Sequence, residues 1–148
     1  QALDNFEGTL NKSLDIKDFD ISFIRGLSLE DGASTITSFT AEIITTTLKK
    51  LLDQNEYDSG KRFFPNFIIC GGGRKNKYLM DLLSKCILEK IGYKKFQLID
   101  EHNIDGDFIE SQAFAFLSIR SFLNLPISFP ETTGCKKPCT GGVLVKNF

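Results

Sequence analysis

The spacing of apolar residues changes along the chain, and each change predicts a different element. Residues 1–31 are largely polar with weak periodicity, which is typical of an irregular lead-in. In the segment 31–52, apolar side chains recur at near-helical intervals and predict a helix, with Asp31 or Ser34 as its N-cap. Because its many threonines are poor helix formers, this helix needs tertiary packing. The polar segment 57–66, which contains a glycine and a proline, predicts a connector.

The middle of the chain alternates between strand and helix patterns. A continuous apolar run at residues 67–70 predicts a strand buried on both faces. After three glycines, Asn76 is a candidate N-cap for a helix. That helix has one apolar stripe, formed by Leu79, Leu82, Leu83, Cys86 and Ile87. The segment KKFQLID, residues 94–100, predicts a second strand.

The last third of the chain contains the most apolar helix pattern. Residues 105–123 predict a helix with apolar side chains nearly all round, which is typical of a central helix. From Asn124 onward, prolines and glycines indicate a long loop, and residues 143–145 predict a terminal strand. The order helix, strand, helix, strand, helix predicts an α/β fold, with a mixed or parallel sheet, flanking helices and right-handed crossovers.

Composition excludes several classes of function. The 148 residues suit one domain. With 18 basic and 19 acidic side chains, the chain lacks the excess of positive charge that is typical of a nucleic-acid-binding protein. No apolar run reaches the roughly 20 residues that cross a membrane. Four cysteines are too few for a dense disulfide framework and favour a cytoplasmic protein. Because the chain begins at Gln1 without a methionine, we expect a piece of a longer protein.

Three consecutive glycines, Gly71, Gly72 and Gly73, separate the first predicted strand from the following helix. They are not a Walker A loop, because no Gly-Lys-Ser/Thr follows, and they lack the third glycine of the Rossmann spacing. What remains is bare backbone on which a flat group such as adenosine could rest, or simply a tight turn. Three glycines are more than most turns need, which slightly favours the nucleotide.

Glu110 has two interpretations. It lies at helical spacing with apolar residues, and Asp107 with Glu110 matches a capping box, in which the glutamate accepts from the N-cap amide. The alternative is a carboxylate near a metal–phosphate centre, bound directly or through water. The pattern alone favours the cap.

The remaining polar residues have simple explanations. His102, the single histidine, lies in a polar turn and is expected to be solvated. Cys135 and Cys139 lack the second ligand pair that a zinc site needs. Three aspartates lack calcium-loop spacing and fit turn chemistry: Asp100, Asp105 and Asp107.

Several blocks together resemble one enzyme family. CGGGRKNKYLMDLL at 70–83, GDFIESQAFAFLSIR at 106–120 and LPISFPETTG at 125–134 are similar in order and spacing to the C-terminal part of anhydro-N-acetylmuramic acid kinases. LDNFEGTLNKSLDIKDF at 3–19 resembles the segment leading out of that family's first lobe. The glycine block alone is of modest specificity, whereas the combination is fairly specific.

The resemblance implies an actin-like (ribonuclease H-like) ATPase lobe. Residues 1–31 would lead in from an N-terminal lobe, and residues 32–148 would form the C-terminal nucleotide-binding lobe. The enzyme would be cytoplasmic, use ATP and Mg²⁺, open the 1,6-anhydro bond of the sugar and phosphorylate O6 to give N-acetylmuramate 6-phosphate in peptidoglycan recycling. The resemblance allows a homodimer of the full-length protein.

The resemblance also implies the site residues. Gly71, Gly72, Gly73 and Asn76 would line the nucleotide site, and Glu110 would lie near the magnesium ion and the phosphates. The family's GTSxDG phosphate loop and its DTGPGN segment with the catalytic base are absent from these residues. We therefore expect this chain alone to have no kinase activity. Two alternatives stay open, a non-catalytic α/β binding or assembly module and another sugar kinase of the same superfamily.

Overall fold

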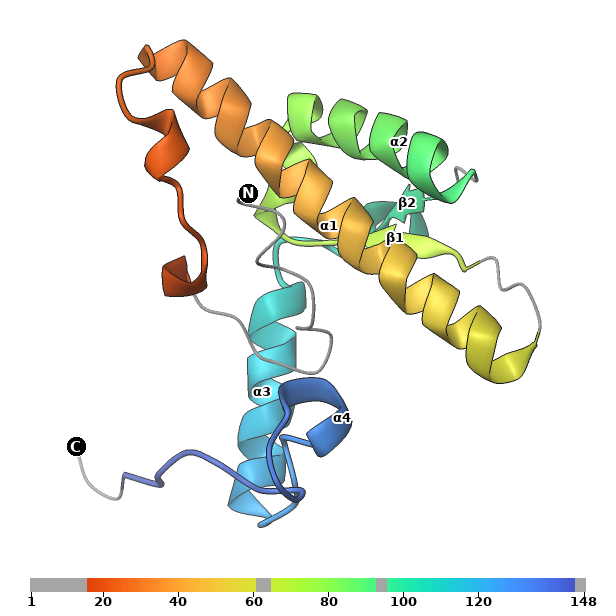
Figure 1. Cartoon of the computed structure of the whole chain (residues 1–148). Helices are drawn as coiled ribbons and strands as arrows, with labels where there is room; N and C mark the ends of the chain where they lie inside the picture. The colour runs from red at the N-terminus through yellow and green to blue at the C-terminus, as the bar shows by residue number, and fades with distance from the viewer. Residues whose placement is uncertain (1–15, 61–64, 93–95, 146–148) are drawn as a thin grey trace.

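The computed structural model describes residues 16–60, 65–92 and 96–145, and all structural statements concern these residues. They form a mixed α/β structure of four α-helices, four short 3₁₀ turns and a two-stranded parallel sheet (Figure 1). In chain order the elements are η2 (Ile16–Asp18), η3 (Ser22–Ile24), α1 (Leu29–Ser59), β1 (Phe67–Ile69), η4 (Gly72–Lys75), α2 (Lys77–Ile91), β2 (Phe96–Leu98), η5 (Ile99–His102), α3 (Ile109–Phe122) and α4 (Pro130–Thr133). None of the described helices combines the length and the apolar character needed to span a membrane.

The first predicted helix exists, but both of its predicted ends are wrong. Ser28 caps α1, because its Oγ accepts a hydrogen bond from the Asp31 amide at 3.0 Å and donates to the Asp31 carboxylate at 2.9 Å. At the other end α1 continues to Ser59, into the predicted connector, and stops before Gly60, whose φ is +65°. The polar residues there contain no helix breaker ahead of that glycine.

The threonines of α1 are accommodated by bonding to their own helix. The hydroxyls of Thr37, Thr40 and Thr45 each donate to the carbonyl four residues earlier, at 2.8–2.9 Å. Thr45 is fully buried, and this bond satisfies its hydroxyl inside the core. Self-satisfied hydroxyls explain how a threonine-rich sequence forms one long helix with a packed face.

The core lies between α1 and α2, which run side by side (Figure 1). Ala41 of α1 and Leu83 and Ile87 of α2 are its buried apolar residues, and the two α2 residues belong to the predicted stripe. At the edge of this interface, Lys90 donates to Glu42 of α1 and also to Thr46 at 2.8 Å. The predicted packing of α2 is therefore confirmed.

Both predicted strands are confirmed, and they pair in parallel. The register places Phe67 opposite Phe96 and Ile69 opposite Leu98. The expectation that the first strand is buried on both faces is wrong, since Ile68 is 49% exposed. The described sheet has two strands, and the described residues leave the Ile68 side of β1 partly uncovered.

The C-terminal third departs most from prediction. We expected α3 to be central, but none of its residues is buried, and in Figure 1 it extends away from α1, α2 and the sheet. A helix that is apolar on all sides is buried only where other elements surround it. Among the described residues, few pack against α3. Residues 143–145 form no strand, and Val143 is 89% exposed. A single antiparallel bridge between Ser128 and Cys139 orders the loop instead.

Candidate functional site

The loops after β1 and β2 meet at one edge of the sheet. Because the strands are parallel, the segments that follow them emerge on the same side. After β1 comes the glycine turn, which we define as residues 71–75, and after β2 come η5 and residues 105–107. The amide of Gly71 donates to the carbonyl of Gly106 at 3.1 Å, so the two connections are directly joined.

The three predicted glycines play different roles in the fold. Gly71 has φ +79° and ψ 173°, a conformation that essentially only glycine adopts. A Cβ on Gly72 would meet no atom within 4 Å, and its φ is not in the left-handed region. A Cβ on Gly73 would meet only Leu79 Cδ2, at an ordinary 3.7 Å. The fold therefore requires glycine at position 71 but not at 72 or 73, and the backbone of Gly71 and Gly72 borders open space.

Asn76 caps α2, as predicted. Its Oδ1 accepts a hydrogen bond from the Leu79 amide at 3.1 Å, and its φ and ψ are extended. The side chain is exposed, and its Nδ2 group makes no hydrogen bond among the described residues. Asn76 thus has one end committed to the helix and a second end able to bind another group.

Arg74 lies buried at the centre of this edge, with 6% of its side chain exposed. Its Nε and Nη2 donate to the two carboxylate oxygens of Asp100 at 2.7 and 3.0 Å. Its Nη1 donates to the Gly71 carbonyl at 3.0 Å and to Asp107 at 2.6 Å. We call Arg74 with these three partners the Arg74 clamp. It joins the glycine turn to the segment that precedes α3.

The charges of the clamp shift the pKa values of its members in the expected directions. The hydrogen bonds from Arg74 lower the pKa of Asp100 to about 2. Lys75, which contacts Asp107 at 2.5 Å, and then Arg74 lower the pKa of Asp107. Asp100 first, and Asp107 next, raise the pKa of Arg74 above its ordinary value. The clamp is therefore fully ionised at neutral pH.

Glu110 lies in the first turn of α3 and is exposed. The predicted capping box is wrong, because the N-cap of α3 is Phe108 and the Asp107 carboxylate is bound to Arg74 and Lys75. Within the described part of the chain, the Glu110 carboxylate has no hydrogen-bonded or ion-paired partner. The structure places Gly71, Gly72, Gly73 and Asn76 in one short segment between β1 and α2, and Glu110 follows Asp107 of the clamp by three residues.

The other candidate residues do not belong to the Arg74 clamp, although Asp105 lies 3.9 Å from Arg74 Nη2. His102 ends η5 and is exposed. Cys135 and Cys139 are free thiols, and the Thr133 hydroxyl lowers the pKa of Cys135. Asp105 accepts a hydrogen bond from the Asp107 amide at 2.9 Å, which confirms its predicted turn role. Among the described residues, no three His, Cys, Asp or Glu side chains gather closely enough to hold a metal ion.

The sequence prediction missed two residues of this edge, Arg74 and Gly106. Asp100 and Asp107 were assigned to turn chemistry, whereas the structure makes them partners of Arg74. Gly106 is buried, and a Cβ there would lie 2.5 Å from Arg74 Nε. One signal was available, namely an arginine a few residues after one predicted strand and acidic residues after the following strand.

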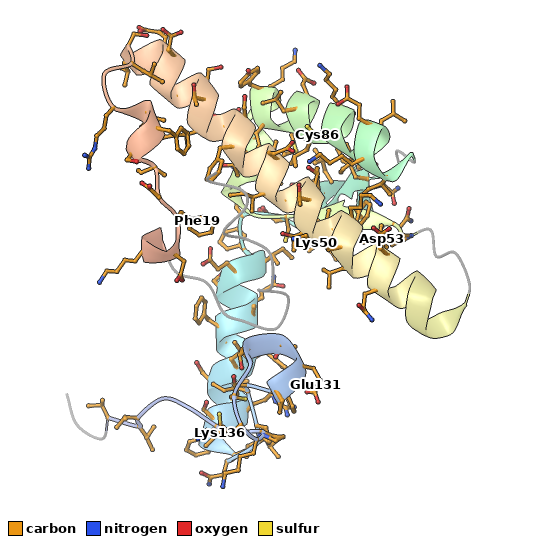
Figure 2. All side chains as sticks on the ribbon, viewed as in Figure 1. Phe19, Lys50, Asp53, Cys86, Glu131 and Lys136 are labelled. Carbon is orange, nitrogen blue, oxygen red and sulfur yellow. The ribbon has the colours of Figure 1, made fainter. Side chains whose placement is uncertain are left out.

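Two hollows lie elsewhere on the described structure, and neither is lined by the glycine turn. One, of about 330 Å³, lies between α3 and residues 141–144. The other, of about 460 Å³, lies between α1 and the segment before it, where Phe19 projects (Figure 2). Its lining is almost entirely apolar and consists of Phe19, Ile21, Ile36, Phe39, Thr40, Ile43 and Ile44. The polar edge at the strand ends is therefore distinct from both hollows.

Comparison with known proteins assigns the chain to a family. The family model described as anhydro-N-acetylmuramic acid kinase matches residues 11–147, a span that includes the glycine turn, the clamp and α3. This chain belongs to the anhydro-N-acetylmuramic acid kinase family. Within the family, it is 51% identical over its full length to the anhydro-N-acetylmuramic acid kinase of Pelagibacter ubique. It is 39% identical over 88% of its length to the Zymomonas mobilis enzyme, and 38% over 95% to that of Brucella abortus.

The chain is much shorter than these family members. It covers 38% of the Pelagibacter ubique protein, 32% of the Zymomonas mobilis protein and 35% of the Brucella abortus protein. The chain thus spans about a third of the length of the curated relatives that it matches. Of the matched residues, 11–15, 61–64, 93–95 and 146–147 lie outside those that the structure describes.

Proposed function

We propose that this chain is the C-terminal, nucleotide-binding lobe of a cytoplasmic, ATP-dependent anhydro-N-acetylmuramic acid kinase of the actin-like superfamily. In the whole enzyme, water would add across the 1,6-anhydro bond and free O6, which would take the γ-phosphoryl group of ATP. The products would be N-acetylmuramate 6-phosphate and ADP. Membership of the family and the polar edge at the ends of two parallel strands support this proposal.

The observation that carries the proposal is the backbone of Gly72. The described fold does not need glycine there, because the residue has no left-handed φ and no neighbour that a Cβ would meet. A bare backbone that the fold does not require is explained if a ligand lies on it. In this proposal the adenosine of ATP rests on Gly71, Gly72 and Gly73, and the Asn76 Nδ2 group donates to it.

Glu110 would act on the phosphate side of the same site. Its carboxylate is exposed in the first turn of α3 and has no partner among the described residues. Carboxylates commonly hold Mg²⁺ through its bound waters when the nucleotide phosphates supply the remaining ligands. Mg²⁺ would neutralise charge on the transferred phosphoryl group. A role through water agrees with the absence of a three-ligand cluster in the described residues.

Residues 1–31 would connect this lobe to an N-terminal lobe that carries the phosphate loop and the catalytic base. Phosphoryl transfer depends on positioning and charge neutralisation from both sides of the nucleotide. We therefore expect the chain to bind nucleotide without turning over sugar. Formation of ADP from ATP and the anhydro-sugar by the purified chain would contradict this division of labour.

The test is a calorimetric titration. A non-hydrolysable ATP analogue, together with Mg²⁺, is titrated into the purified chain. Gly72→Val should lower the affinity for the ATP analogue at least tenfold, because the valine side chain would occupy the space of the ligand. A tenfold loss corresponds to about 1.4 kcal/mol of binding free energy. The same substitution should leave the melting temperature nearly unchanged, since nothing in the fold meets its Cβ.

Gly32→Val is the matched control. Gly32 lies in α1, and its Cβ would also meet nothing within 4 Å, but it is not part of the glycine turn. The control should bind the analogue as tightly as the wild type. Equal affinities for the wild type and Gly72→Val, or no binding by the wild type, would contradict the proposed site.

A further inference from the structure

We propose that Arg74 is a positioning residue of the nucleotide site, which fixes the glycine turn and the start of α3 in one geometry. This inference rests on the proposed function for its ligand, but the contacts that support it are those of the chain itself. Arg74 would not touch the nucleotide. It would act through Gly71, whose backbone begins the platform, and through Asp107, which precedes the helix of Glu110.

The first step is that the backbone N–H and the backbone carbonyl of Gly71 both form hydrogen bonds in this arrangement. Its amide donates to the Gly106 carbonyl at 3.1 Å, and its carbonyl accepts from Arg74 Nη1 at 3.0 Å. Gly71 therefore cannot turn about its φ and ψ without losing bonds on both sides. A residue with no side chain, the most mobile kind of backbone, is held in one conformation.

The second step is that the guanidinium uses its planar shape. Nε and Nη2 form a two-pronged pair with Asp100, while Nη1 bridges the Gly71 carbonyl and Asp107. Such charge-assisted, bidentate bonds fix direction as well as distance. A lysine ammonium has the charge without the planar fork and cannot reproduce these four bonds together.

The third step is that the Arg74 side chain fits at this edge only because residue 106 is a glycine. A Cβ on Gly106 would lie 2.5 and 2.6 Å from Arg74 Nε and Cζ, and 2.8 Å from Ile99 Cγ2. The guanidinium therefore packs directly against the Gly106 backbone. With 6% of its side chain exposed, and four hydrogen bonds already made, Arg74 has little surface with which to contact a ligand.

The test compares Arg74→Lys with Lys85→Gln, an exposed substitution on α2 away from the site. Amide hydrogen exchange is followed at Gly71 and, as an internal reference, at the buried Ile87. In Arg74→Lys, exchange at Gly71 should accelerate on the order of tenfold while Ile87 is unchanged, because local opening is uncoupled from global unfolding. Affinity for the Mg²⁺–ATP analogue should fall by roughly the same factor, since preorganisation is lost. Lys85→Gln should alter neither quantity.

The outcomes separate positioning from other roles. Unchanged exchange at Gly71 in Arg74→Lys overturns the inference, and so does loss of analogue binding while Gly71 stays protected, which would mean direct contact. If exchange accelerates but the wild type binds no analogue, the clamp stands and the proposed function fails. If Arg74→Lys does not fold, Asp107→Asn carries the test. It removes an ionic partner of Nη1 and should give a smaller acceleration at Gly71, while unchanged exchange there would again overturn the inference.

Discussion

Replacing Asn76 should separate two roles that its side chain combines. Its Oδ1 caps α2 by accepting from the Leu79 amide at 3.1 Å, while we assign its Nδ2 group to the nucleotide. Asn76→Ala removes both groups. Loss of an N-cap of this kind costs about 1 kcal/mol, within a range of about 0.5–2. For a chain of this size, we expect the melting temperature to fall by roughly 3–5 °C.

Asn76→Ser keeps the cap and removes only the amide donor. Serine is about as good an N-cap as asparagine, so the melting temperature should stay within roughly 1 °C of the wild type. The lost donor should weaken binding of the ATP analogue about fivefold, as expected for one hydrogen bond worth about 1 kcal/mol. Thermal unfolding followed by circular dichroism gives the first quantity, and calorimetric titration gives the second.

The two variants together test the reasoning. Wild-type affinity in Asn76→Ser would show that Asn76 serves only as a cap and would remove it from the site. An unchanged melting temperature in Asn76→Ala would instead refute the energetic value given to the Leu79 bond. Reduced affinity in both variants with reduced stability in Asn76→Ala alone is the expected pattern.

Two further predictions concern stability. Ile87 is 2% exposed between α2 and α1, so Ile87→Ala should lower the free energy of unfolding by about 2–5 kcal/mol in urea titrations; a change below about 1 kcal/mol would argue against this packing. Asp100 and Asp107 have lower pKa values in the folded chain than in the unfolded one, so the unfolded state binds more protons as the pH falls toward their folded values. The contribution of these two carboxylates to the stability of the folded chain is therefore present above about pH 4, and it is lost as the pH approaches 2. Asp100→Asn should flatten the dependence of melting temperature on pH in this window, and an unchanged profile would count against the ionised clamp.

Local signals predicted the central β-α-β unit well. The apolar run before the glycines, the Asn76 cap and the stripe on α2 all depend on residues close together in the sequence. The start of α1 was predictable on the same basis, because Ser28 and Asp31 are three residues apart, but the cap was placed too late. Its C-terminal end was misjudged because polar composition was given more weight than the absence of a helix breaker before Gly60.

The site could be predicted only in part, for a physical reason. Gly71 and Asn76 act through their own backbone or the next turn, so their roles are visible locally. Arg74 acts through Asp100 and Asp107, and pairing across such separations follows from the strand register rather than from any local pattern. The error at α3 has a similar origin, because an apolar helix pattern specifies a need for neighbours but does not say which residues meet it.

The strands β1 and β2 are each three residues long, so their backbone ladder stops before the glycine turn begins. Beyond that point, within the described residues, the amide hydrogen bond from Gly71 to Gly106 and the contacts of two cations, Arg74 and Lys75, hold the two connections together. Tolerance to mutation at this edge should therefore be set as much by Asp100 and Gly106 as by the glycines themselves. Variation at those two distant positions among natural relatives would be variation in the site, even where the glycine motif is intact.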